Sequence, residues 1–277
     1  MAIWVIARLT LREAARRKIL WAALILGLAF LALYGVGVYL IQREILRERT
    51  AANFIGEMYN FLAMAGLYVV NFLVVMMTVL TSVDTLAGEI ASGTMQAVAT
   101  KPLRRFEIVL GKWLGFVAML AVYLALMAGG VAALTFALTG YAVPGLASGL
   151  GLMLLEGITL LTVCILGGTL LSTLANGVLA FGLYGLAFIG GWIEQIGSLL
   201  RSEAAVNIGI VSSLLMPSEA LWKRAAFEMQ PSLLRDLGAM TPFSASSVPN
   251  ERMILYAGLY IAIALALALR QFSRRDL

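Results

Sequence analysis

Long apolar stretches separated by short charged segments dominate the pattern along the chain. About 20 consecutive apolar residues suffice for a helix to cross a bilayer, and we predict membrane spans over residues 19–41, 61–83, 108–139, 148–174, 177–200 and 254–269. Lys112 lies near the start of the third span, so that span is long, is tilted, or continues a cytoplasmic helix into the membrane. The pattern predicts an all-α integral membrane protein with six transmembrane helices.

Residues 1–18 precede the first span and have the periodicity of an amphipathic helix. Arg8, Arg12 and Arg16 recur every four residues on one face, and small or apolar residues occupy another. This pattern is typical of a helix that lies in the membrane interface. A cleavable signal peptide is the alternative for the first apolar run, but that run is longer than a signal h-region and no convincing cleavage site precedes Gln42.

Two short connections follow from the same pattern. Residues 42–60 carry charges of both signs and predict a short outer helix between the first two spans. The polar break at Ala175 and Asn176 predicts a tight return, which would make the fourth and fifth spans an antiparallel pair.

Residues 201–252 form the longest external segment and contain four of the six prolines. Within it, residues 204–216 are apolar but too short to span a membrane, which favours a surface or re-entrant helix. Residues 218–230 predict a further short helix, with Ser218 as a candidate cap.

Composition agrees with a membrane protein and excludes several kinds of chemistry. The 277 residues are 61% hydrophobic and 13% charged, with a mean hydropathy of +0.94, whereas soluble domains are roughly 25% charged. The chain has no histidine and a single cysteine, Cys164, which lies in an apolar run. Intrachain disulfides, cysteine or histidine metal sites and histidine-based catalysis are therefore excluded. We expect no catalytic, metal-binding or cofactor-binding residues.

The distribution of charge favours one topology. Twelve Lys and Arg residues and five acids lie in the segments that six spans place with the two termini, and eight cations and nine acids lie in the opposite segments. Cytoplasmic segments are enriched in Lys and Arg, so we expect both termini, and the loop 84–107, in the cytoplasm. The same rule explains the pI near 9.5 without a nucleic-acid partner, because the cations gather at the ends of apolar runs.

The loop 84–107 and the start of the third span carry the most informative motifs. Residues 88–94 read G-E-I-A-S-G-T, residues 101–105 read K-P-L-R-R, and residues 110–115 read L-G-K-W-L-G. The first has the spacing of a phosphate-binding loop, but it lacks the lysine that reaches the phosphates and follows no strand. Any ATP hydrolysis must therefore come from another chain.

These three motifs resemble the cytoplasmic loop of type-2 ABC transporter permeases, the family that includes permeases of copper-enzyme maturation and of multidrug and lipid export. The resemblance covers the whole chain. It implies an inner-membrane permease subunit of an ATP-driven exporter that works as a dimer with a second permease copy. It also implies two cytosolic ATPase subunits, which would hold ATP and Mg²⁺.

Within this resemblance, residues 94–100 would form a short coupling helix against the ATPase. Pro102 tends to end a helix just before it, which would let the chain turn back to the membrane. The residues that the resemblance assigns to the ATPase contact are Glu89, Ser92, Gly93, Thr94, Met95, Gln96, Lys101, Arg104 and Arg105. The alternative is an ordinary positively charged cytoplasmic loop.

A second group of residues would face a central cavity if the chain folds like this family. The group consists of Asn71, Phe72, Met76, Glu156, Phe181, Tyr184 and Phe188. Glu156 is an ionisable residue within a span, and such residues normally face a bundle interior or a wet cavity. A structural polar contact or snorkelling toward the outer interface is the alternative for this carboxylate.

Three functions other than cargo export stay open at this point. The permease could transmit motion to a periplasmic or extracellular partner through residues 201–252, or the chain could be a membrane scaffold without transport. An intramembrane enzyme would need several catalytic groups within the spans, but Glu156 stands nearly alone there. No residue indicates the cargo.

Overall fold

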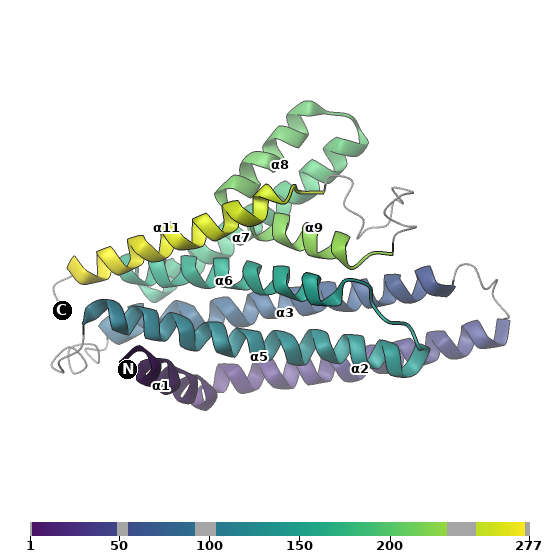
Figure 1. Ribbon diagram of the computed structural model, residues 1–277, viewed down its shortest axis with the longest axis horizontal. Coiled ribbons are helices and arrows are strands. Elements are labelled where there is room, and N and C mark those ends of the chain that lie inside the picture. Colours follow the sequence, from purple (N-terminus) through teal and green to yellow (C-terminus); the bar gives the residue numbers. More distant parts are fainter. Residues whose placement is uncertain (1, 49–54, 92–103, 232–247, 275–277) are drawn as a thin grey trace.

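The computed structural model describes residues 2–48, 55–91, 104–231 and 248–274, and within these ranges the regular secondary structure is helical. Figure 1 shows long helices lying side by side, with a hairpin that projects from them. The helices are α1 (Ala2–Arg16), α2 (Lys18–Glu48), α3 (Ile55–Ala91), α5 (Arg105–Thr139), α6 (Leu146–Leu170), α7 (Thr173–Leu199), α8 (Glu203–Leu215), α9 (Ser218–Glu228) and α11 (Arg252–Arg274).

Six of the described helices are long and apolar enough to cross a membrane: α2, α3, α5, α6, α7 and α11. The predicted all-helical fold with six candidate spans is therefore confirmed. Helices α3, α5 and α6 pack against one another and supply much of the main apolar core, in which Leu67 of α3 and Met153 of α6 are fully buried.

Most of the described spans are longer than the apolar runs predicted, and α3 and α5 are the longest. Helix α3 has 37 residues and α5 has 35, which at 1.5 Å per residue gives roughly 55 and 52 Å. The hydrocarbon core is about 30 Å thick. Both helices therefore extend beyond the membrane at one or both ends. The end of α3 and the start of α5 lie at the same end of the bundle, at the left in Figure 1, with α1 and the end of α11.

The separate outer helix predicted over residues 42–60 is wrong. Helix α2 continues without a break to Glu48, and α3 begins at Ile55. Residues 42–48 contain neither glycine nor proline, and their long polar side chains have good helix propensity. Nothing in them ends the helix that the apolar run begins.

The predicted return at Ala175 and Asn176 lies a few residues too late in the sequence. Helix α6 ends at Leu170 and α7 begins at Thr173, with the Ser172 hydroxyl accepting a hydrogen bond from the Ala175 N–H at 3.5 Å. Asn176 is a buried residue inside α7. Its side-chain Nδ2 donates to the carbonyl oxygens of Val83 and Cys164, at 3.2 and 2.8 Å. This amide ties α7 to α3 and α6.

Helices α8 and α9 form a bent pair between α7 and α11, with an angle of 104° between them. Helix α8 packs along α7 in the projecting hairpin of Figure 1, and α9 returns to the bundle with most of its residues buried. Ser218 was predicted to cap α9, but Pro217 holds the N-cap position and the Ser218 Oγ is buried without a hydrogen bond among the described residues. The pair has the form of a broken span or of a re-entrant loop.

Candidate functional site

The first candidate site lies where α3 ends and α5 begins. The Glu89 carboxylate pairs with the Lys112 ammonium, and both side chains are largely buried. An ion pair with little solvent around it is screened much less than a surface pair. It therefore joins the two helices that lead into and out of residues 92–103.

The motif L-G-K-W-L-G at residues 110–115 fastens the start of α5 to three neighbouring helices. Lys112 contacts α3 through Glu89, and the Trp113 Nε1 donates to the Thr162 Oγ1 of α6 at 2.9 Å. The two glycines face α1, where a Cβ atom at Gly111 would lie 2.6 Å from the Ile6 Cβ. The glycines, Lys112 and Trp113 thus have separate packing roles, and the glycines allow a close approach that any side chain would block.

Further polar contacts hold the same end of the molecule. The Asp84 carboxylate accepts from the Thr173 hydroxyl at 3.1 Å and lies 3.7 Å from the Arg17 guanidinium, which connects α3 with α7 and with the junction of α1 and α2. Arg105 donates to the Ser273 carbonyl oxygen of α11 at 3.2 Å. Arg104 is exposed, and its backbone N–H donates to Glu107 at 3.0 Å.

Of the residues predicted to contact an ATPase, Glu89, Arg104 and Arg105 lie within the described structure. The other six, Ser92, Gly93, Thr94, Met95, Gln96 and Lys101, lie outside the described residues, as does the predicted coupling helix 94–100. The structure places the three described residues on the helix ends that flank this segment.

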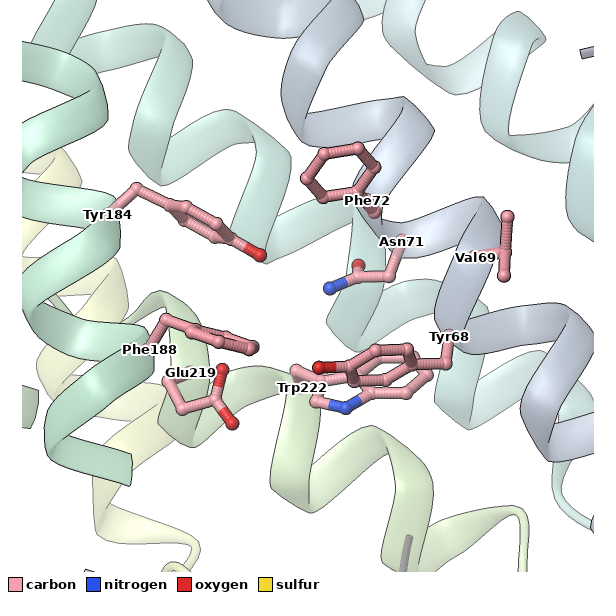
Figure 2. A pocket seen from close by; sticks show the side chains of 8 residues that line it. All are labelled: Tyr68, Val69, Asn71, Phe72, Tyr184, Phe188, Glu219 and Trp222. Carbon is pink, nitrogen blue, oxygen red and sulfur yellow. The ribbon is translucent and has the colours of Figure 1, made fainter. Parts of the chain in front are cut away.

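The second candidate site is a cavity of about 270 Å³ between α3, α7 and α9. Figure 2 shows aromatic rings on several sides of it, with the amide of Asn71 and the carboxylate of Glu219 directed toward the space between them. The lining residues are Tyr68, Val69, Asn71, Phe72, Tyr184, Phe188, Glu219 and Trp222. The cavity is thus mainly apolar, with a small number of polar groups.

The rings are arranged in two pairs. Tyr68 and Trp222 meet edge to face with centroids 5.5 Å apart, and Tyr184 and Phe188 stack at 6.5 Å. Aromatic pairs at these separations prefer such geometries. The first pair joins α3 to α9, and the second runs along α7, so the walls come from helices far apart in the sequence.

Asn71 and Glu156 form a buried polar pair at the side of the cavity. The Asn71 Nδ2 donates to the Glu156 Oε1 at 3.3 Å, and only 4% of Asn71 and 1% of Glu156 is exposed. The Asn71 Oδ1 and the Glu156 Oε2 have no hydrogen-bond partner among the described residues. Asn71 lines the cavity and Glu156 lies behind it, so an acceptor oxygen of Asn71 stands available to a bound group.

Glu219 is the carboxylate that lines the cavity. It is 7% exposed and forms no hydrogen bond or ion pair with another described residue. Its neighbour one helical turn along, Lys223, is bound instead to Glu194 at 2.9 Å and to the Gly191 carbonyl oxygen at 2.9 Å. Glu219 lies on α9, which is not one of the six spanning helices. Burial raises the pKa of Glu219 to about 7, the Lys223 charge opposes the rise, and the Glu194 charge adds to it.

A comparison with known protein families identifies the family of this chain. Over residues 4–277 the sequence matches the family described as ABC-2 family transporter protein. The chain belongs to this family. Among curated proteins, none matches the sequence. The family, together with the six apolar helices, identifies a multi-pass membrane component of a transporter, and confirms the predicted resemblance to type-2 ABC permeases.

The cavity of this ABC-2 protein contains four of the seven residues predicted for it: Asn71, Phe72, Tyr184 and Phe188. Glu156 lies one hydrogen bond away. The two others, Met76 and Phe181, do not line it. Met76 lies one turn beyond Phe72 on α3, and Phe181 packs against the apolar cluster formed by α3, α6 and α7.

The cavity is also lined by four residues that were not predicted from the sequence: Tyr68, Val69, Glu219 and Trp222. Tyr68 precedes Asn71 and Phe72 at helical i+3 and i+4 spacing, which places all three on one face, and this signal was readable. Glu219 and Trp222 lie in a segment that was assigned only to a short external helix. Among the described residues, no group of three His, Cys, Asp or Glu side chains is placed to hold a metal ion.

Proposed function

We propose that this ABC-2 family protein is the permease subunit of an ATP-driven exporter, and that the joined ends of α3 and α5 receive motion from a cytosolic ATPase. The observation that carries this proposal is the buried pair between Glu89 and Lys112, which makes the two flanking helices move together. The ATPase, with its ATP and Mg²⁺, is a separate chain.

The contacts around this pair support a rigid connector. Lys112 belongs to a motif that also fastens α5 to α1 and α6, and Asp84 extends the contacts to α7. A displacement at residues 92–103 therefore acts on five helices at once. Coupling between distant sites needs such packed elements with two discrete arrangements.

The proposed topology puts this end of the molecule in the cytoplasm of a cell with an inner membrane. Helix α1 begins and α11 ends there, so both termini are cytoplasmic, and α1 lies along the interface. The excess of Lys and Arg in these segments supports this orientation. The partners are two ATPase subunits and a second permease copy, with the dimer enclosing the translocation pathway.

The aromatic cavity between α3, α7 and α9 is the proposed cargo-binding part of that pathway. Ligand sites in proteins are typically mostly apolar clefts with a few placed polar groups, and this cavity has that composition. The bent pair α8 and α9 lies at its side, so movement of α9 relative to α3 would change its shape.

The test is ATP hydrolysis by the complex of this permease with its cognate ABC ATPase, reconstituted in nanodiscs. We expect Glu89→Ala and Glu89→Arg to lower permease-dependent ATP turnover several-fold while membrane insertion stays intact, because the link between α3 and α5 is lost. Glu57→Ala removes an acid from the opposite end of the same helix and is the matched control. Unchanged ATP turnover in both Glu89 variants would contradict the coupling role.

A mechanical role toward an external partner is the second candidate function, supported by the hairpin of α7 and α8 that projects from the bundle (Figure 1). A transport assay with the same nanodisc complex transferred to vesicles separates the two. ATP-driven movement of a solute supports export, and ATP turnover without solute movement supports the mechanical role. A scaffold would show no dependence on nucleotide.

A further inference from the structure

We propose that the cavity between α3, α7 and α9 binds a monovalent organic cation with an aromatic or aliphatic body, held by Glu219 and by the faces of the surrounding rings. This inference deepens the proposed function and rests on it for the statement that the cation is cargo. The binding itself depends on this chain alone.

Charge is the first reason for a cation. Among the described residues that line the cavity none is basic, and one is the buried carboxylate of Glu219. The nearest ammonium, that of Lys223, donates to Glu194 and to a backbone carbonyl. A buried carboxylate without an ion-pair partner is costly, and a bound cation would relieve that cost. A bound anion would instead be repelled by the Glu219 carboxylate.

The walls are the second reason. Rings of Tyr68, Phe72, Tyr184, Phe188 and Trp222 surround the space (Figure 2). The face of an aromatic ring attracts a cation within about 6 Å of its centroid, and cages of such rings recognise quaternary ammonium groups. The same rings accommodate an apolar body, so one ligand with both features satisfies the whole lining.

A buried acceptor atom without a hydrogen-bond partner is the third reason for a cation. The Asn71 Oδ1 is buried, belongs to a lining residue and has no hydrogen-bond partner among the described residues. An unpaired buried acceptor is destabilising, and a positively charged group is the ligand that a carbonyl oxygen and a carboxylate would both favour. Phe72 is 48% exposed and Asn71 is 4% exposed, so a ligand would reach the deep polar groups by passing Phe72.

Size restricts the ligand further. A cavity of roughly 150 Å³ holds a benzene molecule. The cavity of about 270 Å³ therefore has room for one ring and a small ammonium group. Benzyltrimethylammonium is a suitable probe, and 2,2-dimethylpropylbenzene is its neutral isostere, in which carbon replaces the nitrogen.

The experiment measures equilibrium binding of both compounds to the permease in nanodiscs, without an ATPase. We expect saturable binding of the cation at least tenfold tighter than that of the isostere. Glu219→Gln should weaken cation binding at least tenfold and leave the isostere unchanged. Glu228→Gln removes a carboxylate from the same helix outside this cavity and should leave both affinities unchanged.

Phe72→Leu provides a second variant that is safe for folding, because this ring is half exposed. This substitution should weaken binding of the cation about threefold and binding of the isostere by less, since leucine keeps the apolar contact and loses the ring face. Equal affinities for cation and isostere, or an unchanged cation affinity in Glu219→Gln, would overturn the proposal and identify an apolar or lipid-binding cavity.

The pH dependence gives an independent readout of the same site. Because the pKa of Glu219 is about 7, more of the carboxylate is ionised at pH 8 than at pH 6, and cation binding should tighten over that interval. Glu219→Gln should abolish the change, and its persistence there would assign the titration to another group. The other titratable or charged side chains that face or flank the cavity are Tyr68 on α3, Glu156 on α6, Tyr184 and Glu194 on α7, and Lys223 on α9.

The binding experiment and the coupling experiment can refute their two proposals independently of each other. A permease that binds the cation but shows no change in ATP turnover on Glu89 substitution refutes the coupling role and leaves the site intact. A complex whose ATP turnover depends on Glu89 but whose cavity does not discriminate the two compounds refutes the cation site and leaves the permease function intact.

Discussion

Replacing Lys223 by methionine should be among the most damaging single substitutions in the bent pair of α8 and α9. The Lys223 ammonium lies 2.9 Å from the Glu194 carboxylate and 2.9 Å from the Gly191 carbonyl oxygen, and 6% and 9% of the two charged side chains is exposed. Lys223→Met fills similar volume but leaves Glu194 buried without its cation. Breaking a buried pair in this way costs about 3–5 kcal/mol.

Removing the acid of the pair should lower the free energy of unfolding less than removing the cation, because Glu194→Gln leaves Lys223 with two neutral acceptors. We expect about 1.5–3 kcal/mol, the range for a hydrogen bond to a charged group. In the double variant neither charge of this pair remains, so its loss should be smaller than the sum of the single losses by about 2 kcal/mol, as coupled neighbours show.

The assay is reversible unfolding in mixed micelles, followed by circular dichroism for the wild type, both single variants and the double variant. Arg43→Met, at an exposed site on α2, is the control for loss of a cation. Two results would contradict this prediction. One is a free energy of unfolding of Lys223→Met within about 0.5 kcal/mol of the wild type, and the other is a double variant whose loss equals the sum of the two single losses.

Three further outcomes follow from the structure. Gly111→Leu should destabilise the protein by about 1–3 kcal/mol and increase proteolysis of α1, because its Cβ would lie 2.6 Å from a side chain of α1; Gly129→Leu on the same helix, with nothing within 4 Å, should not, and equal effects would exclude the close approach as the cause. Asn176→Leu should lower the free energy of unfolding by about 1–3 kcal/mol through loss of two buried hydrogen bonds; an unchanged unfolding midpoint would contradict this. Since burial raises the pKa of Glu219 from 4.5 to about 7, the folded protein binds that proton more tightly than the unfolded chain, so the free energy of unfolding should fall as pH rises from about 4.5 to about 7; the slope relative to Glu219→Gln measures it, and identical pH profiles would refute it.

The spans were predictable because crossing a bilayer imposes a one-dimensional requirement. Every backbone group must be satisfied within the segment, and about 20 apolar residues are needed, so a run such as 61–83 is recognisable without its neighbours. The ends were less predictable. Polar residues 42–48 continue α2 because helix propensity persists past the membrane, and hydropathy does not record this.

The motif at residues 110–115 shows what could be inferred from local sequence and what could not. Its resemblance to the ABC-2 family was readable, and the family match supports it. The reason for its residue types was not readable, because Gly111 is needed for contact with α1 and Lys112 for contact with Glu89, 23 positions away.

The cavity depended on tertiary structure. Tyr68 and Asn71 on α3 were within reach of a periodicity argument, but Glu219 and Trp222 lie some 150 residues later, in a segment whose hydropathy predicts only a short helix. The sequence by itself determined the membrane class and the six candidate spans, because these depend on local composition. The predicted loop 84–107 was too wide, since α3 continues to Ala91 and α5 begins at Arg105. Only the tertiary structure decided that α9 returns to the bundle with its carboxylate beside the rings of α3 and α7, because that contact depends on how α8 and α9 bend and pack rather than on either segment alone.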